Sequence, residues 1–289
     1  MDALLSAAWS GMVVGGLYAS MAVGLTVIYG VSHVFNFAHG HVAVLGAYIA
    51  WLVIAVVNLP LAVGIMVAVA VMVAFGWLLY QLTIRSLLRR TEWAFGSLLF
   101  TLGLAILLEY GMLEAFGPRV KSIPELVSGR INLGFGPITW HDLSLIVIAV
   151  LLIVALWTFL MRSSTGRAMR AVAASVPGAR IVGIDIDRIY GATFALAFAV
   201  TGISGILLGT KAFMTPHIGW EWMIKGFIIV TFGGLGNVPG AIVAAFALGL
   251  IETFVTLYMG TLWVWPAWLA TFIIALWLRP QGILGGRTS

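Results

Sequence analysis

The sequence MRSSTGRAMRAVAASVPGARIVGIDIDR, residues 161–188, is the one long polar stretch on the side of this chain that we expect to be cytoplasmic. Strongly apolar segments precede and follow it. Two carboxylates accompany its five arginines, which are Arg162, Arg167, Arg170, Arg180 and Arg188. Because basic loops beside membrane spans stay on the cytoplasmic side, this composition predicts the location of the loop, residues 162–188, and orients the chain around it.

The same loop has an internal pattern. Residues 166–176 read as a short amphipathic helix with Met169, Val172 and Val176 on one face and Arg167 and Arg170 on another. The Pro-Gly pair at 177–178 is expected to break this helix, and a short apolar piece, residues 179–184, follows. A connector does not need this shape, which favours a docking element for a soluble partner. The alternative is a solvated positive face.

Composition places nearly the whole chain in a membrane. The 289 residues are 62% hydrophobic and 9% charged, with a mean hydropathy of +1.11, whereas a soluble domain carries about 25% charged residues. One crossing takes about 20 apolar residues, so residues 1–289 form a single transmembrane domain. The basic residues cluster beside spans, which argues against nucleic-acid binding. The absence of cysteine excludes disulfides and thiolate metal sites.

The apolar segments predict an all-α polytopic bundle of about eight full spans. A further segment, residues 223–236, is too short to cross by itself and runs into glycines, so we expect it to be broken or re-entrant. No Lys or Arg precedes the first span, which predicts an N-terminus outside. Arg279 and Arg287 follow the last span and predict a C-terminus inside.

Polar residues interrupt an apolar region at residues 30–46. Asn36, His39 and Gly40 are expected at a helix break, and non-helical backbone at membrane depth is tolerated where it is buried or lines a watery cavity. These three residues are therefore candidates for a substrate pathway. The alternative for the flanking His33 and His41 is hydration at the interface.

A second break is predicted in the sequence GGLGNVPG, residues 233–240. Glycines at this density permit unwinding and close backbone approach, so Gly234, Gly236 and Asn237 are further pathway candidates. A phosphate-binding loop would end in Lys-Ser or Lys-Thr, which is missing here. A tight turn is the simpler alternative. The Asn-to-Gly pattern weakly repeats that of Asn36 and Gly40, as in transporters built from repeats.

Two carboxylates fall inside predicted spans. Glu109 and Glu252 are functional candidates, because charges within a membrane are costly, and Glu252 is included in the candidate pathway. A hydrogen-bonded structural role is the alternative for both. The histidines lack metal-ligand spacing, so no metal site is expected. No catalytic constellation or nucleotide motif is present, so we do not expect an enzyme.

Four stretches carry a resemblance that covers most of the chain. They are residues 24–48, 166–188, 232–253 and 279–285. Together they resemble the permease subunits of branched-chain amino acid ABC transporters, of the LivH type. The resemblance implies a subunit of a bacterial inner-membrane importer for branched-chain amino acids or a related small solute. It also implies a second permease, two cytoplasmic ATPases that bind the ATP, and a periplasmic binding protein, with no cofactor in this chain.

The resemblance also assigns the polar loop. It implies that residues 167–184 contact the ATPase and couple its closure to transport, through Arg167, Arg170, Ala171, Pro177, Ala179, Gly183 and Ile184. The rival hypothesis is a secondary transporter that is coupled to protons through Glu109 or Glu252 and works without ATPase subunits. A membrane-embedded enzyme is disfavoured by the missing catalytic residues.

Overall fold

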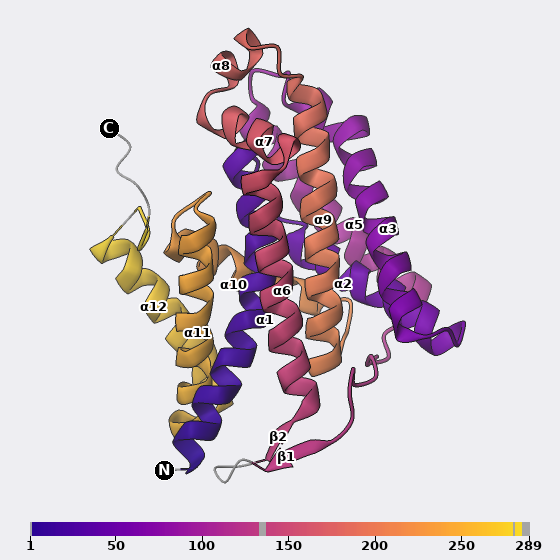
Figure 1. Cartoon of the computed structure of the whole chain (residues 1–289), viewed down its shortest axis with the longest axis vertical. Coiled ribbons are helices and arrows are strands. Elements are labelled where there is room, and N and C mark those ends of the chain that lie inside the picture. Colours follow the sequence, from indigo (N-terminus) through magenta and orange to yellow (C-terminus); the bar gives the residue numbers. More distant parts are fainter. Residues whose placement is uncertain (1, 133–136, 280, 285–289) are drawn as a thin grey trace.

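The computed structural model describes residues 2–132, 137–279 and 281–284 and consists almost entirely of helices (Figure 1). The first half contains α1 (Asp2–Ser32), α2 (His39–Trp51), α3 (Leu61–Leu79), α4 (Arg85–Leu87) and α5 (Trp93–Phe116). Two short π-helical turns, Leu52–Val56 and Tyr80–Ile84, continue α2 and α3. The second half contains α6 (Trp140–Arg162), α7 (Ser164–Ala174), α8 (Val176–Ile181), α9 (Ile186–Lys211), α10 (Ile218–Gly233), α11 (Val238–Met259) and α12 (Val264–Leu278).

Among the described residues, eight helices are long and apolar enough to cross a membrane. This confirms the prediction of a polytopic helical bundle with about eight spans. The 16-residue α10 is not one of the eight, as expected for the short segment of residues 223–236, but it begins at Ile218, earlier than that segment. A 16-residue helix rises about 24 Å, against a hydrocarbon core of about 30 Å.

Helices α1 and α9 form the centre of the bundle and are buried over most of their length, while α3, α6 and α12 expose apolar side chains. Small residues allow the central helices to approach closely. A Cβ on Gly15 of α1 would meet the backbone of Phe246 in α11, and one on Gly46 of α2 would meet the backbone of Gly202 in α9. These contacts hold α1 beside α11 and α2 beside α9 (Figure 1).

The two ends of the bundle differ. The start of α1 lies at the lower end in Figure 1, and α7 and α8 lie at the upper end. The segment between α5 and α6 contains a short two-stranded sheet near its end. Strand β1 (Arg130–Asn132) pairs antiparallel with β2 (Pro137–Thr139) at the lower end. Thr139 then caps α6 by accepting a hydrogen bond from the backbone N–H of Asp142 (3.0 Å).

Candidate translocation path and coupling element

A break in the helical backbone separates α1 from α2. His33 adopts a left-handed conformation (φ 57°) that ends α1, and residues 33–38 are not helical. The ring of His39, at the start of α2, lies 3.0 Å from the carbonyl oxygen of Met21 in the middle of α1. Helix α2 therefore begins inside the bundle, as the sequence predicted for a break at membrane depth.

Helix α10 begins at the same depth as α2. A Cβ on Gly40 would run into the backbone of Gly219 and Met223, and one on Gly219 would run into the ring of His41. The connection from α9, residues 212–217, must therefore re-enter the bundle before α10 starts. Two helix N-termini thus meet backbone to backbone in the interior, and only glycine fits at that junction.

Asn36 and His39 are buried polar residues at this junction. The side-chain oxygen of Asn36 accepts a hydrogen bond from the N–H of Ala38 (3.1 Å), while its amide nitrogen has no hydrogen-bond partner among the described residues. His39 is fully buried and lies 3.4 Å from the hydroxyl of Thr201. Burying a polar group without a partner is costly, so the amide nitrogen of Asn36 is an unusual feature of this junction.

Aromatic rings close the space beside Asn36. The rings of Phe35 and Phe37 lie 5.9 Å and 6.2 Å from that of Phe227 on α10. The cavity that they leave, which Asn36 also lines, measures about 10 Å³. A cavity needs roughly 10–15 Å³ to hold one water molecule. The space beside Asn36 therefore holds at most one water molecule in this structure.

Glu109 belongs to α5. Its carboxylate lies beside the start of α10, where it is buried among nitrogen atoms. Its carboxylate contacts the ring of His217, accepts a hydrogen bond from Trp220 Nε1 (2.7 Å) and lies 3.8 Å from His41 Nε2. The sequence singled out Glu109 as an intramembrane carboxylate. The structure gives it several partners on α2 and α10, so it fastens α5 to the junction of the two broken helices.

Glu252 belongs to a second polar cluster, which joins four helices. Lys225 of α10 contacts the Glu252 carboxylate (3.2 Å), Glu221 (3.0 Å) and the Tyr18 hydroxyl (2.7 Å). Trp268 Nε1 donates to Glu252 (3.0 Å), and so does the Tyr18 hydroxyl (3.1 Å). The Lys225 ammonium also lies within 6 Å of the ring centres of Tyr18 and Trp268.

Lys225 was missed by the sequence reasoning. Its signal was present, because a single lysine in a short apolar segment is as costly as the carboxylates that were considered. Its side chain is 5% exposed. Tyr18, Glu221 and Trp268 were also not predicted as its partners.

Gly234, Gly236 and Asn237 lie away from Asn36 and His39. Gly236 packs on Gly30 near the end of α1, where a Cβ on Gly30 would meet its carbonyl oxygen. Asn237 caps α11 by accepting a hydrogen bond from the N–H of Gly240 (3.0 Å), and its amide donates to the carbonyl of Leu284 (2.6 Å).

The glycine-rich segment thus holds the tail of the chain. Ile283 donates its N–H to the carbonyl of Phe232 (2.8 Å). The structure does not bring this segment together with the closed space beside Asn36, and its assignment to the pathway remains a prediction.

The loop of residues 162–188 forms two short helices, which we call the coupling element (α7 and α8). The predicted break at residues 177–178 is wrong: the chain breaks at Ser175, which is extended (φ −162°) and caps α8 by accepting from the N–H of Gly178 (3.1 Å). Pro177 lies in the first turn of α8, where proline is favoured because its missing N–H would be unpaired anyway. Pro177 therefore starts a helix.

One face of α7 is buried as the periodicity predicted. Met169 and Val172 are each 1% exposed. The two arginines on the other face bond to the end of α6: Arg170 donates to the carbonyl of Leu160 (2.7 Å) and Arg167 to that of Arg162 (2.9 Å). Arginines near a helix C-terminus satisfy its free carbonyls in this way, so these side chains also position α7.

The exposed part of the coupling element is the end of α8. Ile181, the last residue of α8, is 85% exposed, and Val182, which follows it, is 73% exposed. Helix α8 lies at the upper end of the molecule in Figure 1. The sequence reasoning did not single out these two residues. Of the predicted coupling residues, Pro177 and Gly183 are exposed, Ala171 and Ile184 are partly buried, and Ala179 is 3% exposed and packs into the core.

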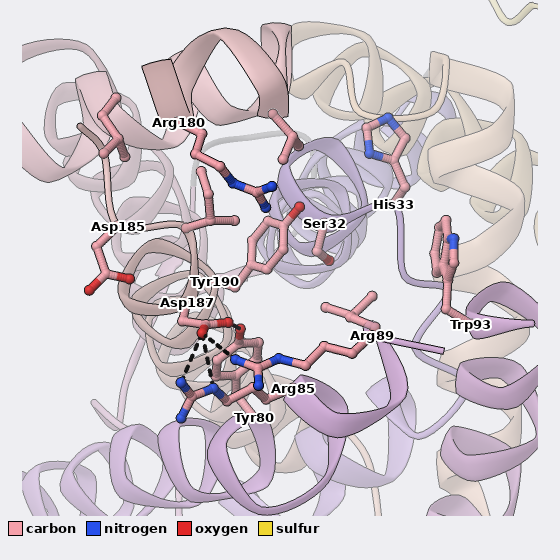
Figure 2. A pocket seen from close by; sticks show the side chains of 14 residues that line it. Ser32, His33, Tyr80, Arg85, Arg89, Trp93, Arg180, Asp185, Asp187 and Tyr190 are labelled. Carbon is pink, nitrogen blue, oxygen red and sulfur yellow. Dashed lines mark hydrogen bonds and ion pairs between the residues drawn. The ribbon is translucent and has the colours of Figure 1, made fainter. Parts of the chain in front are cut away.

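A cavity of about 590 Å³ separates α8 from the ends of α1, α3 and α5 (Figure 2). On its floor, Asp187 at the start of α9 pairs with Arg85 and Arg89 (both 2.9 Å) and accepts a hydrogen bond from Tyr80 (2.9 Å). Arg180 of α8 points into the same cavity. Asp187 thus links the start of α9 to α4 and to the π-helical turn that follows α3.

These features define a multi-pass helical membrane permease with broken helices in its interior. Residues 7–278 match the family described as branched-chain amino acid transport system / permease component. The chain belongs to this family, whose members are transport permease components rather than enzymes, as the sequence resemblance implied.

Relatives of similar length support the assignment. The chain is 30% identical to the high-affinity branched-chain amino acid transport system permease protein LivH of Escherichia coli K12, over 96% of this chain and 94% of LivH. It is also 30% identical, over the same shares, to the corresponding permease protein BraD of Pseudomonas aeruginosa. A more distant relative is the autoinducer 2 import system permease protein LsrC of Yersinia pseudotuberculosis, 28% identical over 66% of this chain and 52% of LsrC. No solved structure matches the chain.

Proposed function

We propose that this chain is the membrane-spanning subunit of an ABC importer in the bacterial inner membrane, which moves a branched-chain amino acid or a related small solute inward. It acts with a second permease subunit, a copy or a paralogue, and with a periplasmic binding protein that delivers the solute. Two ATPase subunits bind ATP on the cytoplasmic side. The family, and the transport systems named for LivH and BraD, support this proposal.

The observation that carries the proposal is the exposed apolar end of the coupling element. Ile181 and Val182 project from a short helix with its own N-cap, on the end of the bundle where the arginines gather. Large apolar side chains at such exposure gain free energy when a partner covers them. The N-terminus outside and the C-terminus inside, as the charges predict, place this end in the cytoplasm, where an ATPase would dock.

The path for the solute runs past the junction of α2 and α10. The path is closed by the rings of Phe35, Phe37 and Phe227, which lie beside the free amide nitrogen of Asn36. A mixed amide and aromatic surface suits a small solute with one polar and one apolar part. Helix α7 packs on α1 and α9, and the non-helical residues before α2 follow α1 directly. A movement of the coupling element would therefore shift α1 and open the path beside Asn36.

The rival is a proton-coupled transporter that works without an ATPase, which the buried Glu109 favours. Glu252 argues against it, since its carboxylate has Lys225, Tyr18 and Trp268 as partners. The rival requires transport to be lost in Glu252→Gln and to survive Arg170→Glu, whereas the importer requires transport to be lost in Arg170→Glu.

The test compares two exposed apolar residues at opposite ends of the molecule. Ile181→Glu should reduce co-purification of the cognate ATPase subunits about tenfold or more and abolish uptake in cells. Leu262→Glu, at a residue that is 90% exposed on the other end, is the matched control and should leave co-purification unchanged. Vesicles that contain only this chain and that accumulate solute when a proton gradient is applied would refute the importer.

A further inference from the structure

The cavity between α8 and the bundle (Figure 2) has the size of a small-molecule site. Its volume is about 590 Å³, and sites for small ligands measure about 300–1,000 Å³. Val176 and Arg180 of α8 form one wall, and the ends of α1 and α3 and the starts of α5 and α9 form the rest. A ligand in this cavity would therefore touch the coupling element and the bundle at once.

The cavity adjoins the space beside Asn36. Ser32, the last residue of α1, and His33, which follows it, line the cavity. After one further residue the chain reaches Phe35, Asn36 and Phe37, which line the small space beside Asn36. A solute that passes Asn36 toward the coupling element would thus enter this cavity next.

Both carboxylates in the wall of the cavity already have arginine partners. Arg85 and Arg89 both pair with Asp187 (2.9 Å each). The other carboxylate of the wall, Asp185, pairs with Arg188 (3.0 Å), which does not line the cavity. These ion pairs leave no carboxylate of the wall to neutralise a further cation.

Arg180 is the arginine of the wall without such a partner. Its side chain points into the cavity from α8 and makes no hydrogen bond or ion pair with any residue that the structure describes. A guanidinium is planar and offers a carboxylate two parallel N–H donors. The charge that the cavity leaves unmatched therefore suits a single carboxylate.

The remaining wall suits an aliphatic group. Five partly buried apolar side chains line the cavity, namely Leu88, Trp93, Val176, Ile184 and Ile186. Covering apolar surface of this kind gains about 25 cal/mol per Å². One guanidinium opposite an apolar wall matches a small carboxylic acid with an aliphatic chain, whereas an inorganic anion would leave the apolar wall uncovered.

We propose that this cavity is an inner binding site for the transported solute, in which Arg180 binds the carboxylate and the apolar wall receives the aliphatic chain. The identity of the solute rests on the function proposed above. Solute that accumulates inside would bind Arg180 of α8 and Leu88 and Trp93 of the bundle together, and so hold the coupling element in the position seen here. Import would therefore slow as the solute accumulates.

The experiment uses a single cysteine, because the chain has none of its own. Val176→Cys places a thiol in the wall, and a maleimide should modify it in the purified full chain in lipid nanodiscs. Leucine and isocaproate, which both carry a carboxylate on a branched chain, should slow this modification. Isoamylamine has the branched chain and an amino group but no carboxylate, and it should not.

Matched variants assign the effect to Arg180. In the Val176→Cys chain, Arg180→Gln should raise the isocaproate concentration for half-protection about tenfold, as expected when a charge-assisted hydrogen bond is lost. Arg162→Gln, at an exposed arginine that does not line the cavity, should leave it unchanged. Val182→Cys controls for the thiol, since Val182 is exposed outside the cavity and none of the three compounds should slow its modification.

Import gives the second readout. Proteoliposomes that contain the complete importer are loaded with leucine, and the initial rate of uptake is compared with that of vesicles without internal leucine. Internal leucine should slow uptake by the wild type. Arg180→Gln should lose this slowing when each of its rates is compared with its own rate in vesicles without internal leucine.

Four outcomes would overturn the proposal. Equal protection by isoamylamine or by inorganic phosphate would show that the cavity does not select a carboxylate with an aliphatic chain. Protection by isocaproate but not by leucine would remove the transported solute as the ligand. Unchanged half-protection in Arg180→Gln would remove Arg180, and wild-type uptake that internal leucine does not slow would remove the feedback. None of these outcomes touches the importer itself, which co-purification of the ATPase subunits tests separately.

Discussion

Replacing Lys225 by methionine should destabilise the protein strongly, because it leaves carboxylates without their buried counter-charge. The side chain of Lys225 is 5% exposed and that of Glu252 is 17% exposed. After the change, the hydrogen-bond donors that remain to the Glu252 carboxylate are the neutral Tyr18 hydroxyl and Trp268 Nε1. Removing one partner of a buried ion pair costs about 3–5 kcal/mol. Glu221 is 41% exposed and can be solvated, so the lower bound of about 3 kcal/mol applies here.

Thermal unfolding in detergent measures this cost. For a chain of this size, each kcal/mol shifts Tm by about 2 °C, so Lys225→Met should lower Tm by about 6 °C. The double variant Lys225→Met with Glu252→Gln removes both charges and should recover at least half of the loss. Lys211→Met is the matched control, since Lys211 pairs with Asp142 while 33% exposed, and should cost under about 1 kcal/mol.

The reasoning would be refuted if Lys225→Met shifted Tm no more than Lys211→Met does. Additive losses in the double variant would also contradict it, because they would mean that the two charges do not stabilise one another. The transport assay adds a second readout. Lys225 holds α10 against α1, α11 and α12, so its loss should reduce uptake more than it reduces the amount of folded protein.

Two further predictions concern other contacts between helices. Gly40→Ala should prevent α2 and α10 from packing together and leave little monodisperse protein on size-exclusion chromatography. The control Gly103→Ala, at a glycine that faces open space, should elute as wild type. Equal yields of the two variants would contradict the close backbone contact between α2 and α10. Asp187→Asn should loosen α9 from Arg85 and Arg89 and cost about 0.5–1 kcal/mol in thermal unfolding, because these ion pairs are at least one third exposed. The control Glu92→Gln, at an exposed position without such a pair among the described residues, should cost less than Asp187→Asn.

The sequence predicted the spans well because apolar length is a local property of the chain. The expected number of full spans, about eight, matches the described helices, and the short segment of residues 223–236 was recognised from its length, although α10 begins earlier, at Ile218. Amphipathic periodicity likewise identified Met169 and Val172 as the buried face of α7. The break in the coupling element was misplaced because a Pro-Gly pair is compatible with a turn as well as with the first turn of a helix, and the cap at Ser175 decides between them.

Only the tertiary structure decided which polar residues face one another. Lys225 and Tyr18 are 207 residues apart, and Asp187 is about a hundred residues from Arg85 and Arg89, so their pairing depends on the rotation and axial register of separate helices. The same holds for the depth of the two breaks: residues 33–38 end beside the middle of α1, while the glycine-rich segment lies near its end. Hydrophobic pattern fixes that a helix crosses the membrane, whereas side-chain packing between helices fixes which of its faces meets which neighbour.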